Sequence, residues 1–156
     1  MSLRELFEAF ERTAIGEAIR HSVWLFPVVE TVHLMALALL GGAVLMLDLR
    51  LLGVGLESQS PSALERQTRP WLLGAITVML VTGAMLAASE ALKLYEKDAY
   101  WLKMGALAAV LAFTFAVKHP MARRDPAIGA ATRMAAFVSI ALWLTVAGAG
   151  RWIGFS

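Results

Sequence analysis

The chain has 156 residues, of which 59% are apolar and only 17% are charged. Soluble proteins contain roughly 45–50% apolar and about 25% charged residues, so a water-soluble enzyme fold is disfavoured and a single membrane domain is predicted. The absence of cysteine excludes disulfides, thiolate metal sites and thiol nucleophiles. A net charge of +2 leaves no basic face of the kind that nucleic acids require, and no nucleic-acid partner is expected.

Residues 2–20 are predicted to form an amphipathic helix at the membrane interface. Apolar residues recur there at helical spacing, at Leu3, Leu6, Phe7, Phe10 and Ala14. Glutamates replace the basic stretch of a secretory signal, so this segment is expected to be retained. A helix that packs on a partner subunit would show the same pattern.

Four apolar segments are long enough to cross a bilayer core of about 30 Å as helices. They cover residues 23–47, 71–88, 101–117 and 134–150. We therefore predict an all-α protein, a four-transmembrane-helix bundle with both termini on one side and connections at 48–70, 89–100 and 118–133. Lys and Arg divide evenly between the two sides of the predicted bundle. If Lys103 is embedded in its helix and Arg4 is too far from a span to count, the side opposite the termini has more of them. Because cytoplasmic loops carry an excess of Lys and Arg, this places the termini on the non-cytoplasmic side.

Ionisable side chains inside these spans predict a site, because each costs about 2.5 to 3.5 kcal/mol near the membrane centre. In the first span Glu30 and His33 are three residues apart, and Asp48 falls in line with Glu30 after whole helical turns. Counted from the midpoints of their spans, Glu30 and Lys103 differ in depth by one residue, or roughly 1.5 Å. We predict a buried Glu30–Lys103 pair, which either registers two helices or serves binding or proton movement.

Haem b is the cofactor to test, because imidazoles that project into small helical bundles commonly hold iron. The candidate cofactor-binding residues are His33, Met79 and His119, with His33 as the metal ligand. His33 and His119 differ in depth by roughly 18 Å, which is awkward for two ligands of one iron. Met79 lies in the middle of the second span and matches the depth of His33 better.

Several short motifs resemble an uncharacterised bacterial family of four-span membrane proteins, a domain of unknown function. They are Glu30-Thr31-Val32-His33, Gly41-Gly42, Asp48-Leu49-Arg50-Leu51-Leu52-Gly53, Pro70-Trp71, Thr82-Gly83, Leu102-Lys103-Met104, His119 and Gly150-Arg151. The resemblance implies the fold and a membrane location, and it brings no established activity. More distantly, a histidine followed by a glycine-rich apolar stretch is similar to membrane domains of small b-type cytochromes and copper-resistance D proteins, which implies redox or copper chemistry by analogy.

The sequence thus leads to one principal functional hypothesis and two alternatives, and it leaves open whether the protein is an enzyme. The principal hypothesis is a bacterial inner-membrane component with a buried site of Glu30, His33 and Lys103 that binds haem or another redox ligand. The first alternative is a non-catalytic accessory or assembly subunit, as a homo-oligomer or in a membrane complex. The second is a transporter, for which four spans are few and no span is broken by proline at mid-depth.

Overall fold

A computed structural model describes residues 2–155, and within this range the chain is helical and contains no strand. The elements in chain order are α1 (Leu3–Glu11), α2 (Ala14–His21), α3 (Leu25–Leu52), α4 (Pro61–Ser89), α5 (Ala91–Tyr95), α6 (Asp98–Phe113), the π-helix η1 (Thr114–Lys118), α7 (His119–Arg123) and α8 (Ala130–Ile153).

Four helical segments are long and apolar enough to span a membrane, which confirms the predicted all-α class. They cover Leu25–Leu52, Pro61–Ser89, Asp98–Arg123 and Ala130–Ile153. Each runs past the end of its predicted apolar segment, because helical hydrogen bonding continues into the polar interface after the apolar run has ended. The predicted connection at 118–133 is therefore wrong in its first part, where Lys118 and His119 remain helical.

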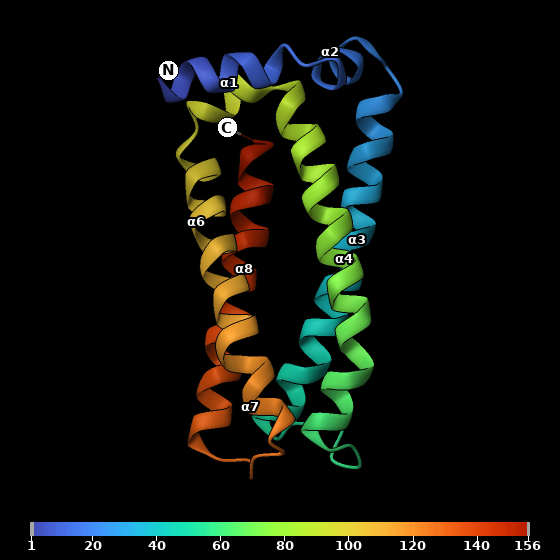
Figure 1. Cartoon of the computed structure of the whole chain (residues 1–156). Helices are drawn as coiled ribbons and strands as arrows, with labels where there is room; N and C mark the ends of the chain where they lie inside the picture. The colour runs from blue at the N-terminus through green and yellow to red at the C-terminus, as the bar shows by residue number, and fades with distance from the viewer. Residues whose placement is uncertain (1, 156) are drawn as a thin grey trace.

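The spans form an antiparallel bundle of two helix pairs, α3 with α4 and α6 with α8 (Figure 1). α3 also packs against α8, and α4 contacts the second pair through α7. The two pairs lie close together near α7 and spread apart toward the opposite end, where both termini lie (Figure 1). This divergence decides which polar residues of the interior are covered.

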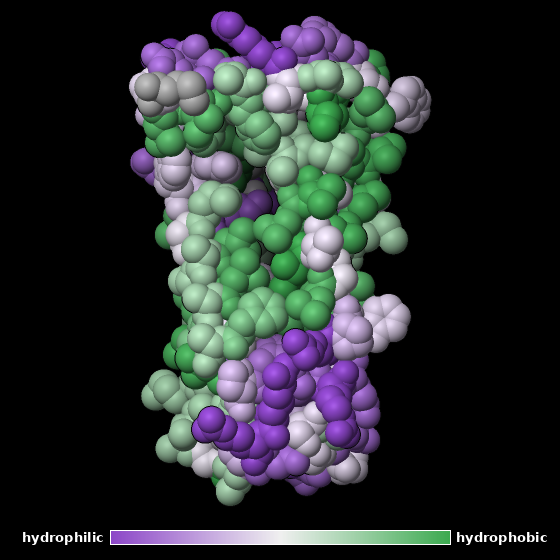
Figure 2. Space-filling view, in the orientation of Figure 1, coloured by the Kyte–Doolittle hydropathy of each residue, from purple (hydrophilic) through white to green (hydrophobic). Residues whose placement is uncertain are grey.

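The bundle has apolar layers inside and an apolar outer surface. One buried cluster joins α3 and α4 through Leu40, Ala43, Val44, Leu72 and Ala75, with Trp143 of α8 packed against it. Large apolar side chains also cover the outside, including Met35, Val81, Phe137 and Leu144, which are 56 to 69% exposed. Figure 2 shows this surface as a green band between hydrophilic ends, the distribution expected where lipid surrounds the middle of the molecule.

The N-terminal segment lies across the end of the bundle as two helices rather than the single predicted one (Figure 1). The chain breaks at Thr13, whose hydroxyl caps α2 by accepting the N–H of Gly16. The second helix is held to the spans by Arg20, which donates to the carbonyls of Ser89 and Glu11. This polar capping of a second helix outweighs continuation of the amphipathic pattern.

Candidate functional site

The imidazole of His33 is held in one tautomer by α4. Its Nδ1 lies 2.8 Å from Oγ1 of Thr82, and the same hydroxyl donates to the carbonyl of Val78 at 2.6 Å. A hydroxyl has one proton, and the carbonyl can only accept, so Oγ1 must accept the Nδ1–H of His33. The lone pair of the imidazole therefore resides on Nε2, the nitrogen left free to bind a ligand.

Two glycines leave room for the ionisable side chains at this level. A Cβ atom on Gly83 of α4 would lie 3.3 Å from Cε1 of His33, so the ring packs directly on the α4 backbone. A Cβ atom on Gly150 of α8 would lie 3.5 Å from Nζ of Lys103, which packs on α8 in the same way. The two pairs are linked electrostatically, because Lys103 lies close enough to His33 to influence it. We call this group of residues from all four spans the His33 site: His33, Thr82, Gly83, Lys103 and Gly150.

Lys103 is a cation without a counter-ion in this part of the bundle. Its side chain is half-buried and close enough to His33 to interact with it electrostatically. Across residues 2–155 the Lys103 ammonium makes no hydrogen bond or ion pair. Figure 2 shows a hollow in the surface between α4 and the α6–α8 pair, with hydrophilic atoms inside it. An embedded, unpaired ammonium of this kind favours an anionic ligand.

The predicted Glu30–Lys103 pair is wrong for the described chain. Glu30 is exposed, and no ion pair joins it to Lys103 among residues 2–155. The reason is the divergence of the helix pairs: the face of α3 that carries Asp48 into the interior near α7 is left uncovered at the other end (Figure 1). Lys103 is instead close enough to His33, on the same helix α3 as Glu30, to interact with it electrostatically.

Met79, the other predicted ligand, lies on α4 one helical turn before Thr82 and Gly83. It is half-buried and packs against the cluster that contains Leu40 and Leu72. Its backbone carbonyl is 3.5 Å from the Thr82 hydroxyl. Met79 therefore borders the His33 site on the side of the bundle centre.

A second polar group, fully buried near α7, joins three spans. The Lys118 ammonium donates to Oδ1 of Asp48 at 3.0 Å and to Oγ of Ser139 at 2.9 Å, and Ser139 donates to Oδ2 of Asp48 at 2.8 Å. The side chains of Asp48 and Lys118 are 0% and 1% exposed. This buried triad corrects the predicted connections at 48–70 and 118–133, because Asp48 and Lys118 lie in helices inside the bundle.

The π-helix explains how adjacent residues reach different partners. The extra residue in η1 widens one turn just before Lys118 and His119. Lys118 enters the triad, while Nδ1 of His119 lies 2.8 Å from Oε1 of Glu65 on α4. Arg123 donates to the same oxygen at 3.0 and 3.1 Å. Single-turn π-helices often occur at functional sites, and here one aims two consecutive ionisable side chains into the bundle.

His119 thus pairs with Glu65 at the α7 end of the bundle, whereas His33 lies toward the other end. The structure does not bring the two histidines together. Glu65 was missed in the sequence because it lies among polar residues that precede the apolar run of α4. The Pro61 that begins α4 and the cap from Ser60 were signals that the helix starts ten residues earlier than its apolar segment.

No chain of hydrogen bonds between described residues links the two polar regions. Apolar side chains of the Leu40 cluster separate them, and within residues 2–155 two buried polar atoms, Oγ1 of Thr114 and Nε1 of Trp143, have no hydrogen-bond partner. No cluster of three or more His, Asp or Glu residues suited to a metal ion occurs in residues 2–155 either. The described side chains therefore form two separate polar regions.

The fold and the embedded polar groups define a multi-pass α-helical membrane protein with an interior site. Within that class, residues 11–156 match the family of unknown function DUF6644, and the chain belongs to this family. Comparison with curated proteins gave no significant match, and neither did comparison with solved structures.

Proposed function

We propose that this protein is a membrane component that binds an anionic redox cofactor at the His33 site, with Nε2 of His33 as the ligand atom. The observation that carries the proposal is the double hydrogen bond at Thr82, which fixes the Nδ1–H tautomer. Histidines that bind metals almost always donate their other ring N–H to a fixed acceptor, which orients the ring and raises its basicity. Haem b is the cofactor class that suits one such imidazole among apolar helices.

Lys103 supports an anionic cofactor in this proposal. Haem b carries two carboxylates, and an ammonium without a counter-ion beside the proposed ligand can pair with one of them. In this proposal Thr82 orients the imidazole of His33. Met79, which borders the site, would be the second residue of the chain able to hold the cofactor.

The test is a titration of hemin into the protein purified in mild detergent. We expect a saturable Soret band at one hemin per chain in the wild type and its loss in His33→Ala. The matched control is His21→Ala, because His21 is an exposed histidine at the end of α2, and this variant should titrate like the wild type. Lys103→Met should weaken binding without shifting the band. Titration of His33→Ala like the wild type would overturn the proposal.

The accessory-subunit alternative has one observation in its favour. Helices α1 and α2 lie across the end of the bundle, and Leu3, Leu6, Phe10 and Ile15 on them are 39 to 55% exposed. Such a surface suits the membrane interface, a second copy of the chain or a partner subunit. A protein that binds no hemin but co-purifies with a defined membrane partner, and loses it in Leu6→Glu, would favour this alternative.

The proposal includes a location, a bacterial inner membrane with the α7 end in the cytoplasm. Exposed arginines at this end, among them Arg66, Arg69 and Arg124, support it through the positive-inside rule. Because the sequence contains no cysteine, single cysteines at the exposed positions Ala9 and Ala127 can report sidedness. An impermeant maleimide added outside should label Ala9→Cys only, and labelling of Ala127→Cys alone would reverse the assignment.

A further inference from the structure

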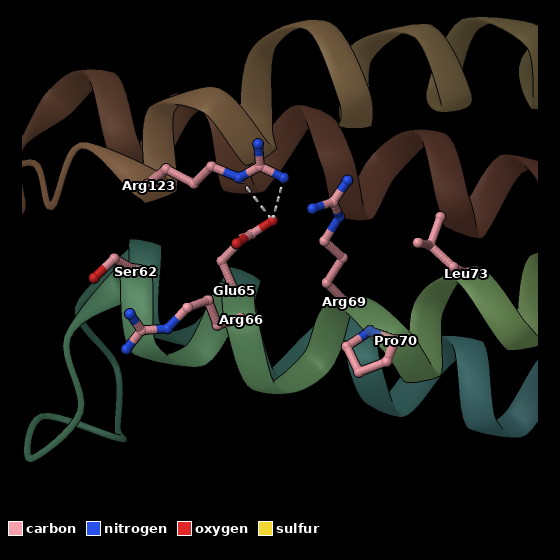
Figure 3. Close-up of a pocket in the computed structure, with 7 residues that line it drawn as sticks. All are labelled: Ser62, Glu65, Arg66, Arg69, Pro70, Leu73 and Arg123. Carbon is pink, nitrogen blue, oxygen red and sulfur yellow. Dashed lines mark hydrogen bonds and ion pairs between the residues drawn. The ribbon is translucent and has the colours of Figure 1, made fainter.

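A cavity opens at the α7 end of the bundle, on the side of α4. It has a volume of about 550 Å³ and is lined by Ser62, Glu65, Arg66, Arg69, Pro70, Leu73 and Arg123. In Figure 3 the guanidinium groups of Arg69 and Arg123 lie on the same side of α4 as the Glu65 carboxylate, while Arg66 extends toward Ser62. We call this cavity the arginine pocket. It is separate from the His33 site, which lies toward the other end of α4.

The charges of the arginine pocket do not cancel. The Glu65 carboxylate is already paired with Arg123, whose two hydrogen bonds reach Oε1, and the same oxygen lies 2.8 Å from Nδ1 of His119. Arg69 makes no hydrogen bond or ion pair with any residue in 2–155, and Arg66 has only a longer-range interaction with Asp125. With Asp125 included, three guanidinium groups face two carboxylates, so an excess of positive charge remains. Arg66 and Arg69 have free donors for an anion.

The membrane-facing side of the pocket is apolar. Leu73 and Pro70 form its wall toward the bundle centre. Pro70 also borders an adjoining apolar groove on α3 and α4 that is lined by Leu39, Pro70, Trp71, Gly74 and Val78. Trp71 is 62% exposed, at the depth where indole rings mark the boundary between headgroups and acyl chains. Along α4 the positively charged pocket is thus followed by an apolar groove. A phospholipid has the matching order, a charged headgroup followed by apolar acyl chains.

We propose that the arginine pocket binds the phosphate of an anionic phospholipid headgroup through Arg66 and Arg69, with an acyl chain in the groove beyond Pro70. Arginine suits phosphate because its planar fork can donate two parallel hydrogen bonds to it. A zwitterionic lipid carries the same phosphate together with a cationic ammonium group, which the surplus guanidinium charge repels. The site therefore distinguishes anionic from zwitterionic lipid.

Free phosphate could accept hydrogen bonds from the same arginines, so the test distinguishes a lipid headgroup from inorganic phosphate. Purified protein is mixed with phosphatidylglycerol, phosphatidylcholine or inorganic phosphate, and bound adducts are counted by native mass spectrometry. We expect retention of phosphatidylglycerol, little retention of phosphatidylcholine and no competition by millimolar phosphate. Equal retention of both lipids, or displacement of phosphatidylglycerol by inorganic phosphate, would overturn the proposal.

Variants connect the adducts to the pocket. An arginine near an anionic membrane surface contributes about 1 kcal/mol, which corresponds to about fivefold in affinity. We expect Arg66→Gln and Arg69→Gln each to weaken phosphatidylglycerol binding by about this factor. The control with the same charge change is Arg124→Gln with Arg133→Gln, since both residues are exposed at the same end but neither lines the pocket. If this control loses as much binding as Arg66→Gln with Arg69→Gln, the attraction is general and the pocket is not the site.

Discussion

Removing Lys118 alone should destabilise the protein more than removing Lys118 and the Asp48 charge together. Lys118→Met deletes two hydrogen bonds and leaves the Asp48 carboxylate, which is 0% exposed, with Ser139 as its remaining donor. An uncompensated buried charge of this kind costs about 3–5 kcal/mol. In Lys118→Met with Asp48→Asn no charge is buried, Ser139 can still donate to the amide oxygen, and the cost should fall to about 1–3 kcal/mol.

The assay is reversible unfolding in mixed detergent and SDS, followed by circular dichroism, for the two single variants and the double variant. Lys93→Met is the control, because it breaks the exposed Lys93–Glu90 pair and exposed pairs are worth about 0–1 kcal/mol. The double-mutant cycle should give a coupling energy of about 2 kcal/mol or more between Lys118 and Asp48. Additive losses in the cycle would refute the reasoning, since they would mean that the two groups do not interact in the membrane.

Three further predictions follow from individual contacts. Thr82→Val removes the acceptor of the His33 Nδ1–H and should weaken hemin binding about 10–100-fold while leaving a Soret band; unchanged affinity in the titration would contradict the tautomer assignment. Gly16→Ala places a Cβ atom 2.6 Å from the Ala88 carbonyl oxygen and should lower the free energy of unfolding by about 1–3 kcal/mol. Gly41→Ala is the control, because the added Cβ atom would have no neighbour within 4 Å beyond its own stretch of helix, and it should not lower this free energy. Equal losses in the two variants would contradict the close α2–α4 contact. The Ser62 hydroxyl and backbone N–H donate to the Asp125 carboxylate and hold its pKa below the usual range. The ionised carboxylate therefore stabilises the fold at pH values above its unfolded-state pKa of about 3.9, and this stabilisation is lost as the pH falls below that value. Asp125→Asn should make the free energy of unfolding less dependent on pH in this acid range. An unchanged pH profile in the variant would contradict the role given to Asp125.

Hydropathy was sufficient to predict the spans because lipid imposes a strong constraint on sequence. Every backbone polar group must be satisfied within the segment, so long apolar runs can only be helices. The even number of spans and the common side of the termini followed directly, and both are observed in the fold (Figure 1). Residues 2–20 were correctly expected to be helical, but the break at Thr13 depends on a local cap and on packing against α4 that no periodicity encodes.

The interior polar groups were only partly predictable. His33 and Lys103 were singled out by their cost in lipid, but depth matching paired Lys103 with Glu30 and not with His33. Glu30 has the same cost and a similar depth, but whether it is covered depends on how far the helix pairs diverge, which is a property of the whole bundle. Lys118 and His119 lie beyond the apolar run, where charged residues normally reach water. Their burial required the π-helix, and the sequence contained no signal for it.

The most direct test of the central claim is the visible absorption spectrum of the protein isolated in mild detergent from cells supplied with haem precursor, recorded before and after dithionite. If Nε2 of His33 holds haem iron, the wild type should show a Soret band that shifts on reduction, and His33→Ala, isolated in the same way, should show none. A colourless wild-type protein, or a band that persists unchanged in His33→Ala, would contradict the account.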